Sequence, residues 1–402
     1  MSTPLHDIFQ RLLAETTTDF HRALFYQINT RNRLTGLVGP RGVGKTTLLL
    51  QYIKKNYPDD KQVFYFSADH LYFKEITLYH FIEQLFLTEA IHTFFIDEIH
   101  KYDNWNQELK NLYDAFPAIK IVFSGSSSID LIKGQYDLSR RAVMYYLHGL
   151  SFREYLEYFH EIKFSSYPLE IITSQADTVM HDIAKTPGLL GHFYHYLKQG
   201  FYPFAKEDPL SYNEKLRTVI EKTIYEDVAN FYNLPTGHLK YFTKILNYLA
   251  SRSPGKINSH NIAKNIGIND KTVNHYLSIL CETGLVTILH PAETGNAGLR
   301  RPEKVFLSNT NLYYAINEYL PGAADIDAVR ELFFVQSAKG GEYEIFCDKQ
   351  GDYQINNHVY EIGGKNKTRK QIHGLKNASL VKDEIIHASF QTIPLLYFGF
   401  LY

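Results

Sequence analysis

The sequence is poor in cysteine and in long apolar runs. Its 402 residues include two cysteines, Cys281 and Cys347, which are too few for a disulfide framework or a cysteine-rich zinc site. No run reaches the roughly 18 apolar residues of a membrane-spanning helix, and residues 1–10 lack the apolar stretch of a signal peptide. We therefore expect a cytoplasmic protein with no membrane contact.

A large net charge of either sign is missing as well. The chain carries 42 Lys and Arg residues against 43 Asp and Glu residues, so its formal net charge is −1. Any nucleic-acid contact must then come from a local basic patch, because the chain as a whole is not basic. The remaining composition, 45% hydrophobic and 21% charged, is typical of a globular protein of about two to four domains.

The most informative stretch that is present is a phosphate-binding loop. Residues 39–46 read Gly-Pro-Arg-Gly-Val-Gly-Lys-Thr, which matches the pattern G-x-x-x-x-G-K-T. The pattern needs a strand before it and a helix after it, and residues 34–38 and 46–57 predict these two elements. Glycines let backbone N–H groups approach a phosphate, and the start of the helix attracts anions. The expected nucleotide-binding residues are Gly39, Pro40, Arg41, Gly42, Val43, Gly44, Lys45, Thr46 and Thr47.

Two acidic residues at the end of an apolar strand supply the second signature. Residues 93–98 read Thr-Phe-Phe-Ile-Asp-Glu. We expect Asp97 to serve Mg²⁺ together with Thr46, and Glu98 to orient or activate the attacking water. An intervening strand at residues 63–66 is typical of ATPases with an inserted strand, not of kinases or small GTPases. The alternative is a pair of acids that the dipole of a following helix favours.

Two further catalytic roles, a sensor of the γ-phosphate and an arginine finger, have more than one candidate residue. A strand over residues 120–124 ends before a serine turn, where Ser124 or Ser126 can sense the γ-phosphate, and Ser126 is our candidate. Arg140 and Arg141 precede a strand over residues 143–147 and are candidate arginine fingers, within one chain or across the interface of a homo-oligomer. The alternatives are a solvated serine turn and an exposed basic pair.

Taken together, these motifs carry a family resemblance. The chain resembles the prokaryotic AAA-type ATPases of the archaeal-ATPase-like group in the stretches Gly-Pro-Arg-Gly-Val-Gly-Lys-Thr-Thr-Leu-Leu, Phe-Ile-Asp-Glu-Ile-His, Phe-Ser-Gly-Ser-Ser-Ser and Leu-Ser-Arg-Arg-Ala-Val. The resemblance implies ATP binding and hydrolysis by an AAA core with a helical lid. Relatives often carry Gly-Gly-x-Pro in the lid, where this chain has Thr-Pro-Gly-Leu-Leu-Gly, so we assign no lid residue to the nucleotide.

The middle of the chain predicts a lid and then a winged helix. We place the ATPase core in residues 1–150, with helices over residues 5–28, and the lid in residues 151–237. Residues 238–310 predict three helices and strands at 285–289 and 305–308, as in a winged helix. This domain either contacts DNA or acts as a hinge or protein contact. Its expected DNA-facing residues are Lys271, Thr272, Asn274 and His275 on the third helix and Arg300 and Arg301 on the wing.

The last segment, residues 311–402, predicts a small α/β domain. A helix over residues 328–337 precedes strands at 343–346, 353–355, 358–362 and 395–401, in an order that resembles the restriction-endonuclease-like fold. In that fold acids and a lysine bind Mg²⁺ and activate water. The candidates are Glu331, Asp352, Glu361 and Lys365, with Asp352 and Glu361 as metal ligands; position 363, where the lysine should stand, is glycine. A basic cluster also suits a phosphate backbone and comprises Lys365, Lys367, Arg369, Lys370 and Lys376.

The expected fold is therefore an α/β P-loop AAA-type core with a helical lid, followed by a winged helix and a small α/β C-terminal domain. ATP and Mg²⁺ are the expected cofactors, and ATP hydrolysis is expected to drive a switch with DNA contact. Two alternatives remain. The protein is an ATP-gated, Mg²⁺-dependent nuclease, or it is a nucleotide switch whose appended domains bind only protein.

Overall fold

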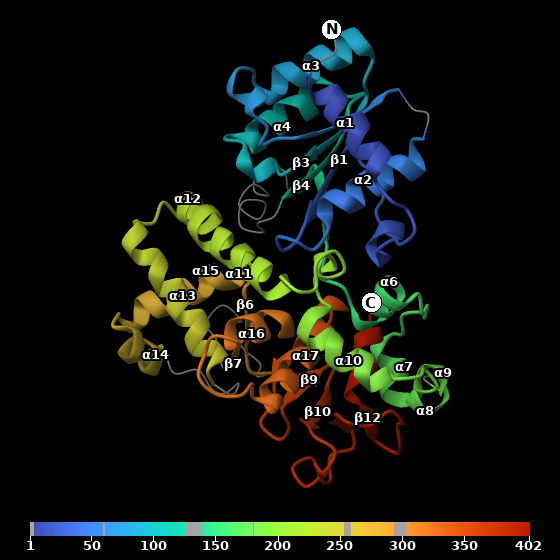
Figure 1. Cartoon of the computed structure of the whole chain (residues 1–402), viewed down its shortest axis with the longest axis vertical. Coiled ribbons are helices and arrows are strands. Elements are labelled where there is room, and N and C mark those ends of the chain that lie inside the picture. Colours follow the sequence, from blue (N-terminus) through green and yellow to red (C-terminus); the bar gives the residue numbers. More distant parts are fainter. Residues whose placement is uncertain are drawn as a thin grey trace. The chain divides into compact units, whose positions relative to one another are not determined.

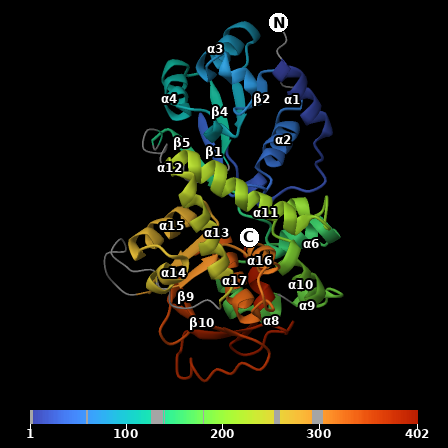
Figure 2. The same ribbon diagram turned by 60° about the vertical axis from the view of Figure 1, so that its left-hand side comes forward.

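A computed structural model describes residues 4–58, 61–125, 138, 140–179, 181–252, 259–292 and 304–402 of the chain. The chain divides into two units, residues 1–148 and residues 149–402, and each is described by itself (Figures 1 and 2). Among the helices of these ranges, none has both the length and the apolar character that a bilayer crossing requires.

The first unit is built on a parallel sheet of five strands in the order β2-β3-β4-β1-β5. Every neighbouring pair in it runs parallel. Four of its strands are buried along most of their length, as expected for a parallel sheet that helices cover on both faces. The strands are β1 (Leu34–Val38), β2 (Val63–Ser67), β3 (Thr93–Asp97), β4 (Lys120–Gly125) and β5 (Ala142–Tyr146).

Helices flank this sheet, with α1 beside α2 and α3 beside α4. The helical spacing expected over residues 5–28 falls into two parts, because α1 ends at Glu15 before a run of threonines, which are poor helix formers, and helical structure resumes at residues 23–26. The helix α4 had no prediction. The helical elements are α1 (Pro4–Glu15), η1 (Ala23–Tyr26), α2 (Lys45–Asn56), η2 (Leu71–Lys74), α3 (Leu78–Glu89), η3 (Ile99–Lys101) and α4 (Trp105–Ala115).

The second unit begins with short helices. They are α6 (Phe152–His160), α7 (Leu169–Ser174), α8 (Ala176–Val179), α9 (His181–Ala184), α10 (Leu189–Gln199), η4 (Pro203–Ala205), α11 (Tyr212–Lys222), the π-helix η5 (Thr223–Val228) and α12 (Ala229–Tyr232). Three further helices and an antiparallel hairpin follow: α13 (Thr236–Ala250), α14 (Ser259–Ile266), α15 (Asp270–Glu282), β6 (Val286–Leu289) and β7 (Lys304–Leu307).

The end of the second unit is a mixed sheet of five strands in the order β12-β11-β10-β9-β8. Strands β10, β11 and β12 run parallel, while β8 and β9 run antiparallel to their neighbours. The helix α17 lies against β10. The elements are α16 (Thr310–Asn317), α17 (Ile326–Gly340), β8 (Phe346–Cys347), β9 (Tyr353–Ile355), β10 (His358–Gly363), β11 (Ala378–Lys382), β12 (Thr392–Pro394) and η7 (Leu395–Phe400).

The expectation of a strand over residues 395–401 is wrong, because these residues form the 3₁₀ helix η7. All six of its residues are buried, so the run has no alternation to distinguish the two structures. A short, wholly apolar run predicts burial but does not decide between strand and helix. The strand expected at residues 343–346 is also shifted, since β8 covers only Phe346 and Cys347.

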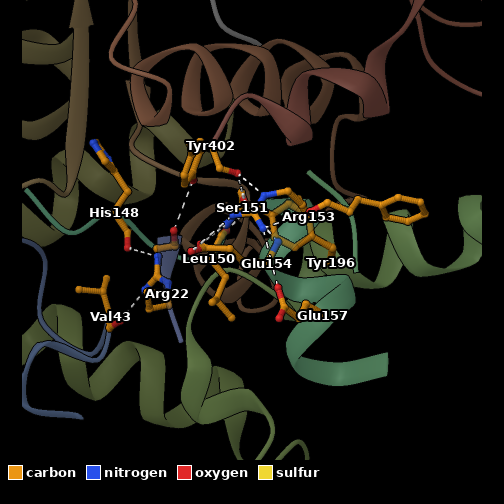
Figure 3. A network of polar contacts seen from close by, with 12 residues as sticks. Arg22, Val43, His148, Leu150, Ser151, Arg153, Glu154, Glu157, Tyr196 and Tyr402 are labelled. Atoms are coloured by element: carbon orange, nitrogen blue, oxygen red, sulfur yellow. Dashed lines mark hydrogen bonds and ion pairs between the residues drawn. The ribbon is translucent and has the colours of Figure 1, made fainter. Parts of the chain in front are cut away.

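The start of the second unit and residue Tyr402 lie side by side, 251 residues apart in the sequence (Figure 3). Ser151 caps α6 by accepting from the Glu154 N–H, and its hydroxyl donates to the Tyr402 carbonyl at 2.8 Å. Arg153 Nε donates to the same carbonyl at 3.0 Å. The first helix after the sheet unit is thus tied to the last described residue.

Candidate functional site

The phosphate-binding loop joins β1 to α2. Gly39 stands against the backbone of Leu147, where an added Cβ would lie 2.3 Å from the Leu147 carbonyl oxygen. Gly44 directly precedes α2 with φ of 96°, a left-handed conformation that favours glycine. The loop therefore folds more tightly than side chains at these two positions would allow.

Lys45, the first residue of α2, lies inside the loop. Its side chain is buried, and its Nζ donates to the carbonyl oxygens of Gly39 and Pro40, at 2.9 Å each. An ammonium group buried in this way needs such acceptors. A phosphate held by the loop would offer the same ammonium a charged acceptor, and hydrogen bonds to charged acceptors are the stronger ones.

Asp97, at the end of β3, is 2% exposed and accepts four hydrogen bonds. One carboxylate oxygen accepts from Thr46 Oγ1 at 2.5 Å and from the Tyr65 hydroxyl at 3.0 Å. The other accepts from the Glu98 backbone N–H at 3.1 Å and from the Ser124 hydroxyl. The two residues that the sequence assigned to a metal, Thr46 and Asp97, are therefore in direct contact.

Glu98 leaves the strand in a left-handed conformation with φ of 51°. Burial raises the pKa of its carboxyl and Asp97 adds to the rise, while Lys45 and Arg41 oppose it. His100 Nε2 lies 3.6 Å from the Glu98 carboxylate. Burial, and then Lys101 and the cations of the loop, lower the pKa of His100 to about 3, so its imidazole is neutral at pH 7.

Three residues of this site had no sequence prediction. Tyr65 and His100 contact the acidic pair, and Arg22 precedes the sheet. Arg22 donates to the Val43 carbonyl at 3.0 Å and to the His148 carbonyl at 2.8 Å, so it ties the loop to the end of the unit (Figure 3). No sequence motif identifies these three residues. A tyrosine in an apolar strand, such as Tyr65, is ordinarily a core residue.

The two arginine candidates lie away from the loop. Arg141 precedes β5, and the parallel register pairs Ala142 with the first residue of β1, whereas the loop follows the last. Its guanidinium forms two 3.1 Å hydrogen bonds to Asp114. Arg140 is exposed. A finger role for either arginine stays a prediction.

The structure describes only some of the remaining expected site residues. Ser126 lies outside the described residues, whereas Ser124 is buried against Asp97. Thr47 is exposed on the first turn of α2. Arg300 and Arg301 of the expected wing also fall outside the described residues.

The second unit holds a polar pocket of about 490 Å³. Its lining includes Glu331 from α17, Asp352 before β9, and Lys365 and Lys367 after β10. Glu331 accepts from Lys304 Nζ at 2.8 Å and from the Tyr353 hydroxyl. Asp352 accepts from the Ile362 N–H at 2.8 Å. Over the ranges that the structure covers, no group of three or more His, Cys, Asp or Glu side chains is arranged to hold a metal.

Glu361, on β10 beside this pocket, is 0% exposed. Lys367 Nζ forms an ion pair with the Glu361 Oε1 atom at 2.5 Å, and neither carboxylate oxygen of Glu361 has a hydrogen-bond partner of good geometry among the described residues. Burial raises the pKa of Glu361, the ammonium group of Lys367 opposes the rise, and Asp352 adds to it.

The lysine beside Glu361 is Lys367, not Lys365 as the sequence suggested. Strand parity was the reason to choose Lys365, but β10 ends at Gly363. A turn then brings Lys367 back over the strand, where an added Cβ on Gly363 would lie 2.6 Å from its side chain. Lys367 thus occupies the space that a side chain at position 363 would fill.

Comparison with known proteins agrees with the geometry of the first unit. Residues 31–156 match the family model described as the AAA domain. The parallel sheet and the phosphate-binding loop of the first unit agree with this match and support an AAA-type P-loop domain. Residues 190–321 match a domain of unknown function, DUF8612. That range crosses the borders predicted at residues 237 and 310, which stay predictions.

The relatives are themselves uncharacterized. The chain is 29% identical over 384 residues to the uncharacterized protein MJ1637 of Methanocaldococcus jannaschii, covering 89% of this chain and 80% of that protein. It is 24% identical over 270 residues to MJ1544 of the same organism, covering 64% and 57%. Among solved structures, AMPPCP-bound DnaA from Aquifex aeolicus is 13% identical and covers 70% of this chain and 89% of DnaA, with a TM-score of 0.28. Because the TM-score is this low, we infer no property of this chain from DnaA.

Proposed function

We propose that the first unit binds ATP with Mg²⁺ and hydrolyses it, and that the bound nucleotide switches the activity of the second unit. The observation that carries the proposal is the hydrogen bond between Thr46 and Asp97, at 2.5 Å. It joins the loop of β1 to the acid of β3 across the intervening strand β4. The AAA domain match over the same residues supports it.

Each residue of the loop has a task in this proposal. Lys45 exchanges its two carbonyl acceptors for the β- and γ-phosphate oxygens. Thr46 and Asp97 would hold the metal, because hydroxyl and carboxylate oxygens are the ligands that Mg²⁺ prefers. A bound Mg²⁺ neutralises charge that develops on the phosphates.

Glu98 is the proposed base. Its raised pKa reflects a carboxylate that burial makes a better proton acceptor, which suits a group that orients or activates water. Ser124 holds Asp97 from the neighbouring strand β4, so it is placed to report changes at the metal ligands. Within this scheme the finger arginine would come from a second copy of the chain.

Calorimetry with ATP and Mg²⁺, together with turnover assays, tests the proposal. Lys45→Ala should weaken binding by at least about 100-fold, since a charged hydrogen-bond donor to phosphate is lost. Lys55→Ala, which removes an exposed lysine from the same helix, should leave binding unchanged. Glu98→Gln should keep its affinity and lose about 100- to 10,000-fold in turnover. A wild-type protein that does not bind ATP would end the proposal.

A second candidate function is Mg²⁺-dependent phosphodiester cleavage in the second unit. It is supported by the pocket that Glu331, Asp352 and Lys367 share beside the buried Glu361. Carboxylate oxygens suit Mg²⁺, which would polarise a phosphate and activate water there. Plasmid nicking in Mg²⁺ tests it with Asp352→Asn and Glu361→Gln, and with Glu384→Gln at the pocket rim as control. Equal nicking by all four proteins would remove this candidate.

A further inference from the structure

The helix α13 and the residues just after it carry three cations that no carboxylate of the described residues neutralises. Lys240, Lys244 and Arg252, the last just beyond the helix end, are exposed. None of the three forms an ion pair with any residue that the structure describes. Residues 236–252 contain no Asp or Glu at all. In a chain with a net charge of −1, this face is a local basic patch of the kind that polyanions need.

Two half-buried tyrosines lie beneath these cations. The Lys240 and Lys244 ammonium groups lie 5.4 and 5.6 Å from the centre of the Tyr241 ring. The Arg252 guanidinium lies 4.8 Å from the ring of Tyr248. Such contacts hold a cation over a ring without neutralising its charge. Cations alternate with aromatic rings along the helix, an arrangement typical of nucleic-acid grooves.

Parts of the other two surfaces that the sequence offered to DNA are already paired or flanked by acids. The helix α15 carries one lysine, Lys271, against Asp270 and Glu282. In the C-terminal basic cluster, Lys367 is paired with Glu361. Arg369 also has partners, because its guanidinium donates to the backbone carbonyl oxygens of Gln391 and Ala378.

We propose that the exposed face of α13 binds the phosphate backbone of a nucleic acid, with Lys240, Lys244 and Arg252 as the phosphate contacts. Lys240 and Lys244 are one helical turn apart, about 6 Å along the axis, which suits successive phosphates of one strand. An acidic protein is a poorer partner, because lysine is depleted from protein–protein interfaces. The inference does not depend on ATP hydrolysis.

Fluorescence anisotropy of the full chain without nucleotide tests the inference, with a labelled 30-nucleotide single strand and a 30-base-pair duplex as probes. The triple variant Lys240→Ala/Lys244→Ala/Arg252→Ala should weaken binding to the preferred probe at least about tenfold at low salt. The slope of log affinity against log salt should fall by about 2.7 for the duplex or about 2.1 for the single strand, because three phosphate contacts are lost.

A matched control removes three other exposed cations from the same unit. Lys163, Lys185 and Lys215 each pair with a carboxylate, so their triple alanine variant should keep both the affinity and the salt slope. Both variants should melt within a few degrees of the parent. Three results would overturn the inference: no binding of either probe by the parent, equal losses in the two variants, or equally strong competition by polyglutamate of the same charge. Because the assay contains no ATP, a negative result would leave the ATPase proposal unaffected.

Discussion

Two buried carboxylates on strands, Asp97 in the first unit and Glu361 in the second, have different kinds of partner. Asp97 accepts from three hydroxyl groups and one backbone N–H, so both of its carboxylate oxygens have neutral hydrogen-bond donors. Glu361 is more buried, yet among the described residues its one ion pair is with Lys367, and neither of its oxygens has a hydrogen-bond partner of good geometry there. The donors to Asp97 are neutral groups, whereas the group beside Glu361 is itself a cation. The Asp97 carboxylate is therefore stabilised by neutral hydrogen-bond donors, and the Glu361 carboxylate is stabilised by an opposite charge.

The largest expected effect comes from removing the single cation beside Glu361. Lys367→Ala leaves a buried carboxylate without its charge partner, which should lower the free energy of unfolding by about 3 kcal/mol. Urea unfolding at pH 8 measures it. Lys365→Ala, two residues away and exposed, should stay within about 0.5 kcal/mol of the parent. Equal values for the two variants would show that Glu361 does not depend on Lys367.

The free energy of unfolding should depend on pH through the buried His100 of the first unit. The pKa of His100 is lowered to about 3 in the folded state, so below pH 6.5 the unfolded chain takes up a proton that the folded protein does not. The stability from this group is complete above pH 6.5 and is lost as the pH falls. Parent protein should lose about 1.4 kcal/mol per pH unit more than His100→Gln between pH 6 and pH 4. Parallel stability curves for the two proteins would contradict this.

A smaller loss is expected when one of the four donors to Asp97 is removed. Tyr65→Phe deletes a buried hydroxyl but leaves three donors, so we expect about 1 to 2 kcal/mol of destabilisation in denaturant unfolding. Tyr26→Phe alters an exposed tyrosine and should be neutral. A loss as large as that of Lys367→Ala would erase the contrast between the two carboxylates.

The smallest effect is expected at the surface pair of Arg141 and Asp114. Both side chains are partly exposed, and exposed ion pairs contribute less than about 1 kcal/mol. A double-mutant cycle with Arg141→Ala and Asp114→Ala measures their coupling. Coupling above about 2 kcal/mol would mean that the pair organises the sheet edge and is not free to act elsewhere.

Prediction from the sequence succeeded where neighbours along the chain decide the structure. The loop glycines, Lys45 and the strand before them form one local unit, and so does the apolar strand that ends in Asp97. Prediction failed where a distant or returning segment decides. The exchange of Lys365 for Lys367 depends on the turn after Gly363, and η7 depends on burial from every side.

The sequence alone determined that a phosphate-binding loop and an acidic strand end exist, because both depend on residue types at fixed short spacings. Only the tertiary structure decided which groups surround them. Tyr65 and Ser124 reach Asp97 from the neighbouring strands β2 and β4, and Arg22 reaches the loop from before β1. The physical reason is that strand order is set by packing of the whole sheet, which no local pattern records.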